Sequence, residues 1–219
     1  RGLGDVYKRQ SFPLTLAAPV SFTATDPVPD VVFVGQSAAF KVPVTNTSQN
    51  SAWFNLSTEL TFSDGDNDYT APIIGAQFLA GGDTDTLYFE SQPVNAAMTP
   101  GFYTPALNVS GTDEHGATFA SAVNTPAQSL LVTAVEITGI SATATASRNT
   151  TDTVTVFIEN KGSSTVTITD AEAVFTDGSF TSLTPPAVPF EILAGAEQSV
   201  KVPVAIGPTT TPGPYTIDA

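Results

Sequence analysis

The chain has 219 residues, of which 41% are hydrophobic, and its 21 acidic against 7 basic residues give a formal net charge of −14. The hydrophobic content suffices for packed cores and argues against intrinsic disorder. Nucleic acid and anionic membrane surfaces are excluded as favourable partners, because no basic patch is available to neutralise phosphate groups. Without Cys, neither a disulfide nor a thiolate metal site can form. No apolar run approaches the about 18 residues of a membrane-spanning helix, so we expect no membrane span.

The first ten residues, Arg-Gly-Leu-Gly-Asp-Val-Tyr-Lys-Arg-Gln, are the codon-for-codon translation of a transposase-based sequencing adapter. We therefore interpret residues 1–10 as an assembly artefact, exclude them from the fold and regard the gene as a metagenomic-type fragment. Residues 11–19 are expected to be a linker or the tail of a preceding segment.

Frequent Thr, Ser and Val, with many Gly and Pro, are typical of an all-β protein. From residue 20 onward, short extended runs alternate with turn residues. The clearest runs are residues 38–46, 53–62, 86–90 and 102–109, with a hairpin turn at 111–116 and a closing strand within 117–134. Phe40, Val42 and Val44 fall on one face of the first run, and Val154, Val156 and Ile158 fall on one face of a later run.

Four motifs recur in the same order, about one domain length apart. Residues 99–104 (Thr-Pro-Gly-Phe-Tyr-Thr) return as 211–216 (Thr-Pro-Gly-Pro-Tyr-Thr), and Leu-Ala-Gly at 79–81 returns at 193–195. Residues 42–46 match 156–160, and 62–65 match 175–178. A Pro-Gly turn followed by a Tyr that enters a strand is typical of β-sandwiches, and the repetition indicates two copies of one module.

We therefore predict two tandem immunoglobulin-like β-sandwich modules, at residues 20–134 and 135–219. In the first copy residues 104–134 follow the Tyr and include the closing strand, whereas only residues 216–219 follow it in the second copy. We expect the second sandwich to be truncated at its C-terminal end, without a closing strand. Tyr103 and Tyr215 are expected to be structural, with each phenol bonded to backbone near the corner.

The loop Asp-Gly-Asp-Asn-Asp at residues 64–68 could bind a cation. Asp64, Asp66 and Asp68 occupy alternate positions, a spacing that lets a turning loop direct carboxylate oxygens at Ca²⁺. The second copy has only Asp177 at the matching place. A solvated acidic loop is the competing interpretation, so calcium is the single cofactor considered.

Asn46, Asn55, Asn108 and Asn149 each begin an Asn-x-Ser/Thr pattern for N-glycosylation. Such patterns also arise by chance in a chain rich in Ser and Thr. The single Trp, Trp53, lies in the expected third strand, where a sandwich commonly buries a large aromatic side chain. We expect Trp53 to pack in the core, with a platform for stacking a ligand as the alternative.

No residue set supports catalysis. His115 is the single His, in a turn between Glu114 and Gly116, and no Gly-x-Ser-x-Gly sequence accompanies it. The carboxylates lie in loops and turns rather than as a facing pair. We predict that the chain is not an enzyme.

An apolar strand ending in Asn (residues 44–47 and 158–162), a Leu-Ala-Gly step and Pro-Gly-x-Tyr-Thr together resemble the CARDB-like immunoglobulin-type repeats of bacterial and archaeal cell-surface or secreted proteins. Asn160-Lys161-Gly162 is close to the Asn-x-Gly common in those repeats, and Asn46-Thr47-Ser48 departs from it. The resemblance covers about residues 20–219. It implies an extracellular or cell-surface protein whose modules act as spacers, adhesive stalks or accessories, without catalytic residues.

Two functions follow as hypotheses. The first is a structural or adhesive stalk, whose partners are the neighbouring repeats of the parent chain and a cell-surface polysaccharide or protein. The alternative is a pair of accessory carbohydrate-binding modules attached to a secreted hydrolase, contacting polysaccharide through exposed rings such as Trp53, Tyr69 or Phe102. A row of solvent-facing rings on one sheet favours sugar binding, and buried rings favour the stalk.

Overall fold

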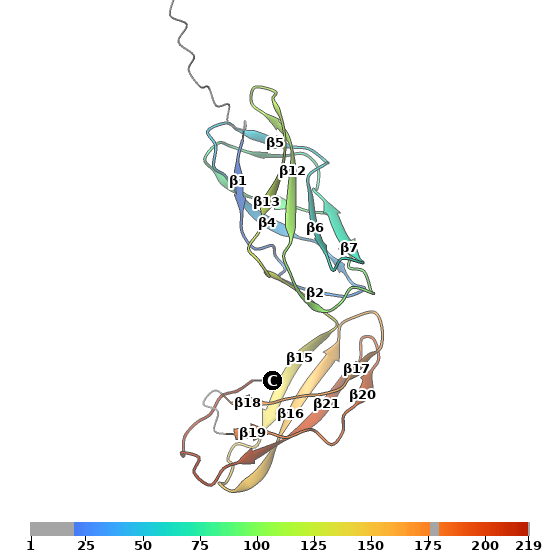
Figure 1. Ribbon diagram of the computed structural model, residues 1–219, viewed down its shortest axis with the longest axis vertical. Coiled ribbons are helices and arrows are strands. Elements are labelled where there is room, and N and C mark those ends of the chain that lie inside the picture. Colours follow the sequence, from blue (N-terminus) through green and yellow to red (C-terminus); the bar gives the residue numbers. More distant parts are fainter. Residues whose placement is uncertain (1–19, 176–179, 219) are drawn as a thin grey trace, which may run out of the picture.

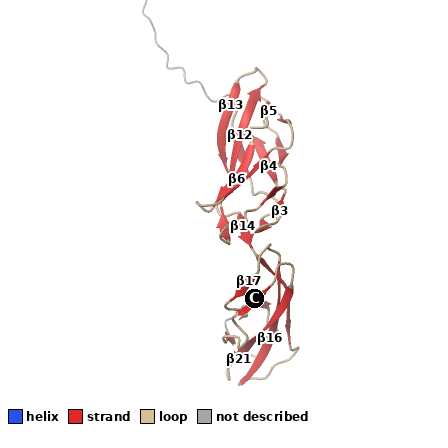
Figure 2. Ribbon diagram, turned by 90° about the vertical axis from the view of Figure 1, so that its right-hand side faces the viewer, coloured by secondary structure: helices blue, strands red, loops and turns tan. Residues whose placement is uncertain are grey.

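The computed structural model describes residues 20–175 and 180–218, and every regular element in this part of the chain is a β-strand. The all-β fold class is therefore confirmed. The strands form an upper and a lower group in an elongated molecule (Figures 1 and 2). The adapter (1–10), the linker (11–19) and Asp177 lie outside the described residues.

The first strand group comprises β1 to β14. Its strands are β1 (Phe22–Ala24), β2 (Val31–Phe33), β3 (Ser37–Ala38), β4 (Lys41–Asn46), β5 (Ala52–Phe54), β6 (Glu59–Ser63), β7 (Asp68–Pro72), β8 (Gln77–Leu79), β9 (Thr84–Tyr88), β10 (Gln92–Pro93), β11 (Gly101–Tyr103), β12 (Ala106–Asp113), β13 (Thr118–Asn124) and β14 (Leu130–Thr133). The largest sheet has the order β7-β6-β12-β5-β8, with β13 also paired to β12, and it is accompanied by the sheets β1-β4-β9, β11-β14-β2 and β10-β3.

One hydrophobic core fills the first strand group. On β4 alternate side chains point inward, so Val42 and Val44 are completely buried. Phe62 and Tyr69 stack with their ring centroids 4.5 Å apart. The Tyr69 hydroxyl donates a hydrogen bond to the Ala38 carbonyl (3.0 Å), and burial raises the pKa of this phenol to about 12. Tyr69 is therefore a core residue, and the expectation that its ring could be exposed to a ligand is wrong.

The second strand group comprises β15 to β22. Its strands are β15 (Val135–Ala142), β16 (Thr150–Asn160), β17 (Val166–Ile168), β18 (Val174–Phe175), β19 (Phe180–Ser182), β20 (Phe190–Ile192), β21 (Glu197–Ile206) and β22 (Ile217–Asp218). The main sheet has the order β15-β16-β21-β19, and two pairs, β17-β20 and β18-β22, lie beside it. A separate core lies here, built on the alternating inward side chains of β16 and β21.

The two groups share strand pairings as well as motifs. Ala106, three residues after Tyr103, lies opposite Thr61, the residue before Phe62. Asp218, three residues after Tyr215, lies opposite Val174, the residue before Phe175. In both groups, the strand that follows the Tyr therefore pairs with its neighbouring strand in the same register.

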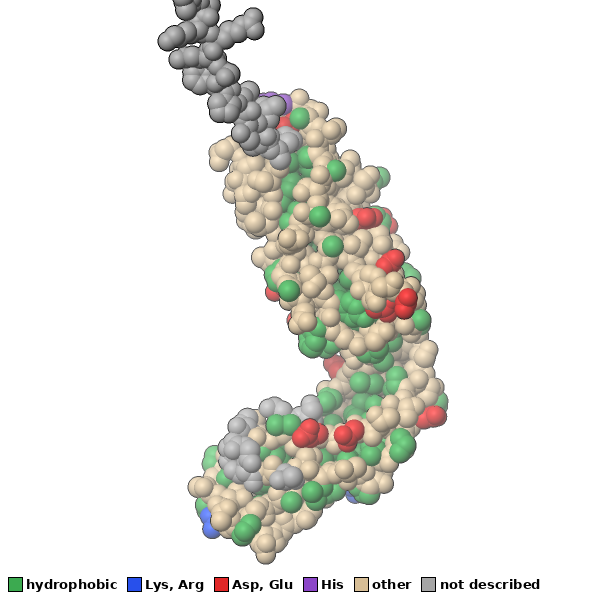
Figure 3. All heavy atoms as spheres, in the orientation of Figure 1, with side chains coloured by type: hydrophobic (Ala, Val, Ile, Leu, Met, Phe, Trp, Pro, Cys, Tyr) green, Lys and Arg blue, Asp and Glu red, His purple; other side chains and the backbone are tan. Residues whose placement is uncertain are grey.

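The groups meet at Ala134, between β14 and β15. The Gly162 amide donates to the Ala134 carbonyl (3.0 Å), and the Ser163 amide donates to the Val34 carbonyl (3.2 Å). Gly35 packs so closely here that an added Cβ would lie 1.8 Å from the Ser163 hydroxyl oxygen. The surface view shows a bend where the groups join (Figure 3).

Candidate functional site

Trp53 lies on the outer face of the largest sheet. On β5 the side chains of Ala52 and Phe54 are buried, so the intervening Trp53 points outward and is 43% exposed. Phe54 takes the core position instead, in an edge-to-face contact with Phe119 (ring centroids 5.9 Å apart). The preferred prediction that Trp53 packs in the core is wrong, and the alternative of an exposed ring agrees with its position.

Phe78 on β8 is the cross-strand neighbour of Trp53. The ring centroids of this pair are 5.0 Å apart with an interplanar angle of 50°, and Phe78 is 49% exposed. Cross-strand aromatic pairs hold each other in place on a sheet. Two solvent-facing rings therefore form one continuous apolar patch.

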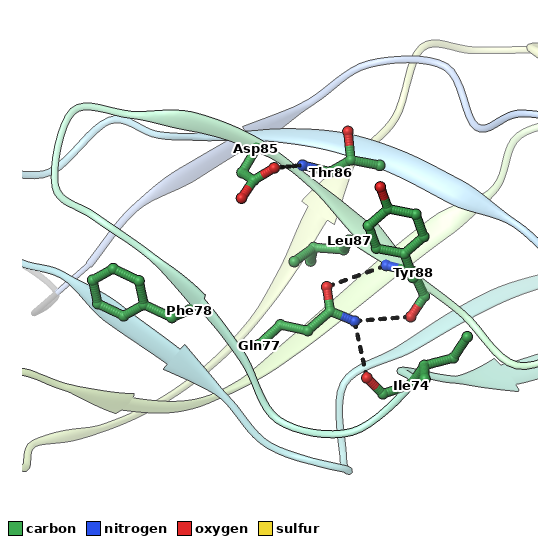
Figure 4. Close-up of a pocket in the computed structure, with 7 residues that line it drawn as sticks. All are labelled: Ile74, Gln77, Phe78, Asp85, Thr86, Leu87 and Tyr88. Carbon is green, nitrogen blue, oxygen red and sulfur yellow. Dashed lines mark hydrogen bonds between the residues drawn. The ribbon is translucent and has the colours of Figure 1, made fainter.

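A shallow hollow of about 520 Å³ lies beside Phe78, between β8 and β9 (Figure 4). It is lined by residues from β8, from β9 and from the loop before β8: Ile74, Gln77, Phe78, Asp85, Thr86, Leu87 and Tyr88. β8 pairs with β5 and β9 pairs with β4, so the hollow lies where the edges of two sheets meet.

The Gln77 side chain bridges the two sheet edges. Its amide nitrogen donates to the Tyr88 carbonyl (3.0 Å) and to the Ile74 carbonyl (3.2 Å), and its amide oxygen accepts from the Tyr88 amide (3.2 Å). The Ile74 amide also donates to the Tyr88 carbonyl, at 2.7 Å. These bonds join the backbone of Tyr88 to the loop before β8 beside the hollow (Figure 4).

Tyr88 lies on the far side of Gln77 from Phe78 and is 46% exposed (Figure 4). The Lys41 ammonium lies 5.7 Å from the Tyr88 ring centroid, at the distance of a cation–π contact. At the other end of the hollow, the Asp85 carboxylate accepts a hydrogen bond from the Thr86 amide (2.7 Å). The site therefore combines exposed rings with a carboxylate, a hydroxyl and an amide.

The acidic loop that was the calcium candidate is organised differently. The Asp64 carboxylate accepts hydrogen bonds from the backbone amides of Asp66 (3.0 Å), Asn67 (2.7 Å) and Thr99 (2.9 Å). These bonds, with that of Thr99 the largest cause, hold the pKa of Asp64 well below its usual range. Among the described residues, no three acidic or His side chains are grouped so that they could hold a metal ion. The structure thus does not bring Asp64, Asp66 and Asp68 together as ligands, and it gives Asp64 a role in joining two loops.

The four glycosylation candidates have different surroundings. Asn46 is completely buried, and its side-chain nitrogen donates to the Asn50 carbonyl (2.8 Å). Asn46 therefore cannot carry a glycan in the folded chain, which corrects that prediction. Asn55 and Asn149 are exposed and Asn108 is half-buried.

The remaining candidates lie apart from the hollow. The Tyr103 hydroxyl donates to the Thr99 carbonyl, and the Tyr215 hydroxyl donates to the Thr211 carbonyl, four residues upstream in both strand groups. Phe102 is 66% exposed but lies on β11, in a different sheet from Trp53. His115 is exposed in the β12–β13 hairpin, where its ring nitrogen lies 3.6 Å from the Glu114 carboxylate.

A second hollow, of about 530 Å³, lies in the second strand group. Residues 142–154 and 204–217 supply most of its lining. Its aromatic members, Phe175, Phe180 and Tyr215, contact one another and belong to the core. The hollow beside Phe78 is therefore the better candidate for recognising a ligand.

Comparisons with known proteins give no family. No protein-family model and no curated protein matches the chain. Among solved structures, a crystal structure of a protein of unknown function from Porphyromonas gingivalis W83 is 15% identical, with a match that covers 86% of this chain and 84% of that chain. Its TM-score is 0.27, so this likeness carries no argument. Within residues 20–175 and 180–218, no helix is long and apolar enough to cross a bilayer.

Proposed function

We propose that this chain is a non-catalytic spacer segment of a larger extracellular or cell-surface protein, built from two tandem immunoglobulin-like β-sandwich modules. The observation that carries the proposal is the presence of two separate hydrophobic cores, one in each strand group. The groups are placed end to end (Figures 1 and 2). Such an arrangement separates whatever lies at the two ends of the segment.

Matched corners support the view that the groups are copies of one module. Asn46 and Asn160 end equivalent strands, and both are completely buried. Each side-chain nitrogen donates to the carbonyl four residues downstream, at 2.8 Å. The same pattern at two places is expected from duplication of one unit.

The resemblance to CARDB-like repeats supports the extracellular setting, and in that setting the partners would be neighbouring repeats of the parent chain. The acidic composition suits a solvated segment, because a net charge of −14 opposes self-association. Adhesion would require a partner-binding surface in addition to the spacer.

Small-angle X-ray scattering of residues 20–219 tests the spacer. A single compact domain of this length would have a radius of gyration of about 16 Å, whereas two modules of about 100 residues touching end to end give about 21 Å. We expect the larger value, with little change between dilute and concentrated samples. A value near that of the compact domain would contradict the proposal.

A second candidate function, an accessory carbohydrate-binding pair beside a secreted hydrolase, is favoured by the exposure of Trp53. Sequencing the source DNA on both sides of this segment distinguishes the two settings. Further modules of this kind with an anchor support the spacer, and an adjoining hydrolase domain supports the accessory role.

A further inference from the structure

Exposed apolar side chains gather at one edge of the first strand group. Trp53, Phe78, Tyr88 and Ile74 are 43–52% exposed, and they come from β5, β8, β9 and the loop before β8. Exposed apolar groups scattered singly are common, whereas a contiguous patch beside a hollow marks a binding site. This edge therefore needs an explanation beyond packing.

We infer that the surface formed by Trp53, Phe78, the adjoining hollow and Tyr88 binds the sugar rings of a neutral polysaccharide. This inference does not depend on the spacer proposal; it deepens the carbohydrate-binding candidate by naming the surface and the class of sugar. We call this surface the aromatic edge.

The chemistry of the aromatic edge suits a sugar. The faces of aromatic rings carry negative partial charge, and the C–H groups on one face of a pyranose ring carry positive partial charge, so the two stack favourably. Sugar hydroxyls also require hydrogen-bonding partners. Asp85 is among the residues that line the hollow, on the side of Phe78 (Figure 4), and its carboxylate can accept hydrogen bonds from sugar hydroxyls.

The negative charge of the protein favours a neutral polysaccharide over an acidic one. Asp85 lines the hollow, and the whole chain has a formal charge of −14, so a uronic acid or sulfate group would be repelled. Among the described residues, Lys41 is the one cation with an interaction at this surface, where its ammonium lies over the Tyr88 ring.

The aromatic edge is also held in shape before a ligand arrives. Trp53 and Phe78 contact each other, and Gln77 joins the backbone of Tyr88 to that of Ile74. A rigid surface loses little conformational freedom on binding, which favours affinity for a repeating, flexible chain.

Trp53 is the single Trp of the chain, so its fluorescence reports directly on the aromatic edge. The experiment titrates the protein with oligosaccharides of β-glucan, mannan, xylan and chitin, and with oligogalacturonate as the acidic probe. Affinity electrophoresis with the parent polysaccharides gives a second readout. We expect a saturable fluorescence change and retarded migration with at least one neutral sugar, and neither effect with oligogalacturonate.

Matched variants connect this binding to the aromatic edge. Phe78→Ala retains Trp53 as the reporter and is expected to weaken binding at least tenfold, as is Trp53→Ala in electrophoresis. Phe102→Ala removes a more exposed ring on a different sheet and should leave binding unchanged. Circular dichroism checks that each variant is folded.

Three results would overturn the inference. The first is no response to any neutral sugar, and the second is retardation by the acidic probe alone. The third is an equal loss of binding in folded Phe102→Ala and Phe78→Ala, which would show that binding is not located at the aromatic edge.

Discussion

Asn46 and Asn160 each end a central strand and turn the chain toward the next one. In each group the backbone of this Asn forms two hydrogen bonds with the turn before β9 or β21: Gly82 and Gly195 donate to its carbonyl, and its amide donates to Asp83 or Ala196. The side-chain nitrogen adds a bond to Leu79 or Ile192 (3.5 and 2.9 Å). One side chain therefore satisfies backbone groups that would otherwise be buried without partners.

We expect Asn46→Ala and Asn160→Ala each to destabilise its own strand group by about 1–3 kcal/mol, because buried carbonyls lose their donor. Urea unfolding measures the effect, with Trp53 fluorescence for the first group and far-UV circular dichroism for both. Asn124→Ala, at an exposed position of β13, is the control and should change stability by less than about 0.5 kcal/mol. An Asn46→Ala variant as stable as this control would contradict the role assigned to the corner.

Sequence reasoning reached some of these residues and missed others. The repeated Pro-Gly-x-Tyr-Thr is enough to pair Tyr103 with Tyr215, since the contact of each hydroxyl is local in sequence. Trp53 could not be placed in the same way, because it adjoins Phe54 and either ring could have faced the core. The glycosylation pattern at Asn46 gave no sign that this amide would be buried, because its partners lie as far away as Leu79.

At the scale of elements, the loop between β6 and β7 is tied to the segment that precedes β11. Asp64 accepts the Thr99 amide, Thr99 in turn accepts the Tyr103 hydroxyl, and Asn67 accepts a bond from Asn95 (3.0 Å). The carboxylate thus orients the turn that carries the repeated Tyr. Burial raises the pKa of Tyr103, and the negative charge of Asp64 acts in the same direction.

We expect Asp64 to make the first strand group sensitive to acid. Its folded pKa is lowered, so its contribution to stability is fully present above the ordinary Asp pKa of about 3.9 and is lost as the pH falls toward the folded value. Asp64→Asn should therefore lower the urea midpoint at pH 7, and the difference from wild type should narrow at pH 3. Urea unfolding at each pH, followed by Trp53 fluorescence, measures this difference in midpoint. Asp66→Asn, at an exposed position of the same loop, is the control and should unfold at the same urea concentration as the wild type. If the difference between Asp64→Asn and the wild type were the same at pH 7 and pH 3, the role of the Asp64 charge would be refuted.

Strands with regular alternation could be predicted, and contacts between strand edges could not. Alternation identified the buried faces of β4 and β16, because each strand carries apolar residues at every second position. The hollow depends on Gln77 and Tyr88, which belong to edge strands of two different sheets. Nothing in the local sequence around either residue indicates that those edges meet.

At the scale of the whole molecule, the junction decides whether the segment keeps one shape. Close contacts there include two backbone hydrogen bonds, and Gly35 packs directly against Ser163. Gly35 also has φ +74, a conformation that disfavours any side chain. A spacer with a fixed bend holds its ends in a defined relation, and a spacer with a loose joint does not.

Gly35→Ala is expected to disturb the junction in two separable ways. The positive φ should cost the first strand group about 1–2 kcal/mol, and the new methyl group should displace Ser163 and alter the angle between the groups. Since the chain has no Cys, spin labels at Ser121→Cys and Lys201→Cys, both exposed, report the distance between the groups. The parent should give one narrow distance distribution, and Gly35→Ala should shift or broaden it.

Adding Ser163→Gly should restore the distance but not the lost stability, because it removes the collision and leaves the backbone strain. A broad distribution in the labelled parent would mean that the contacts at Gly35 and Ser163 do not hold the two groups in one orientation.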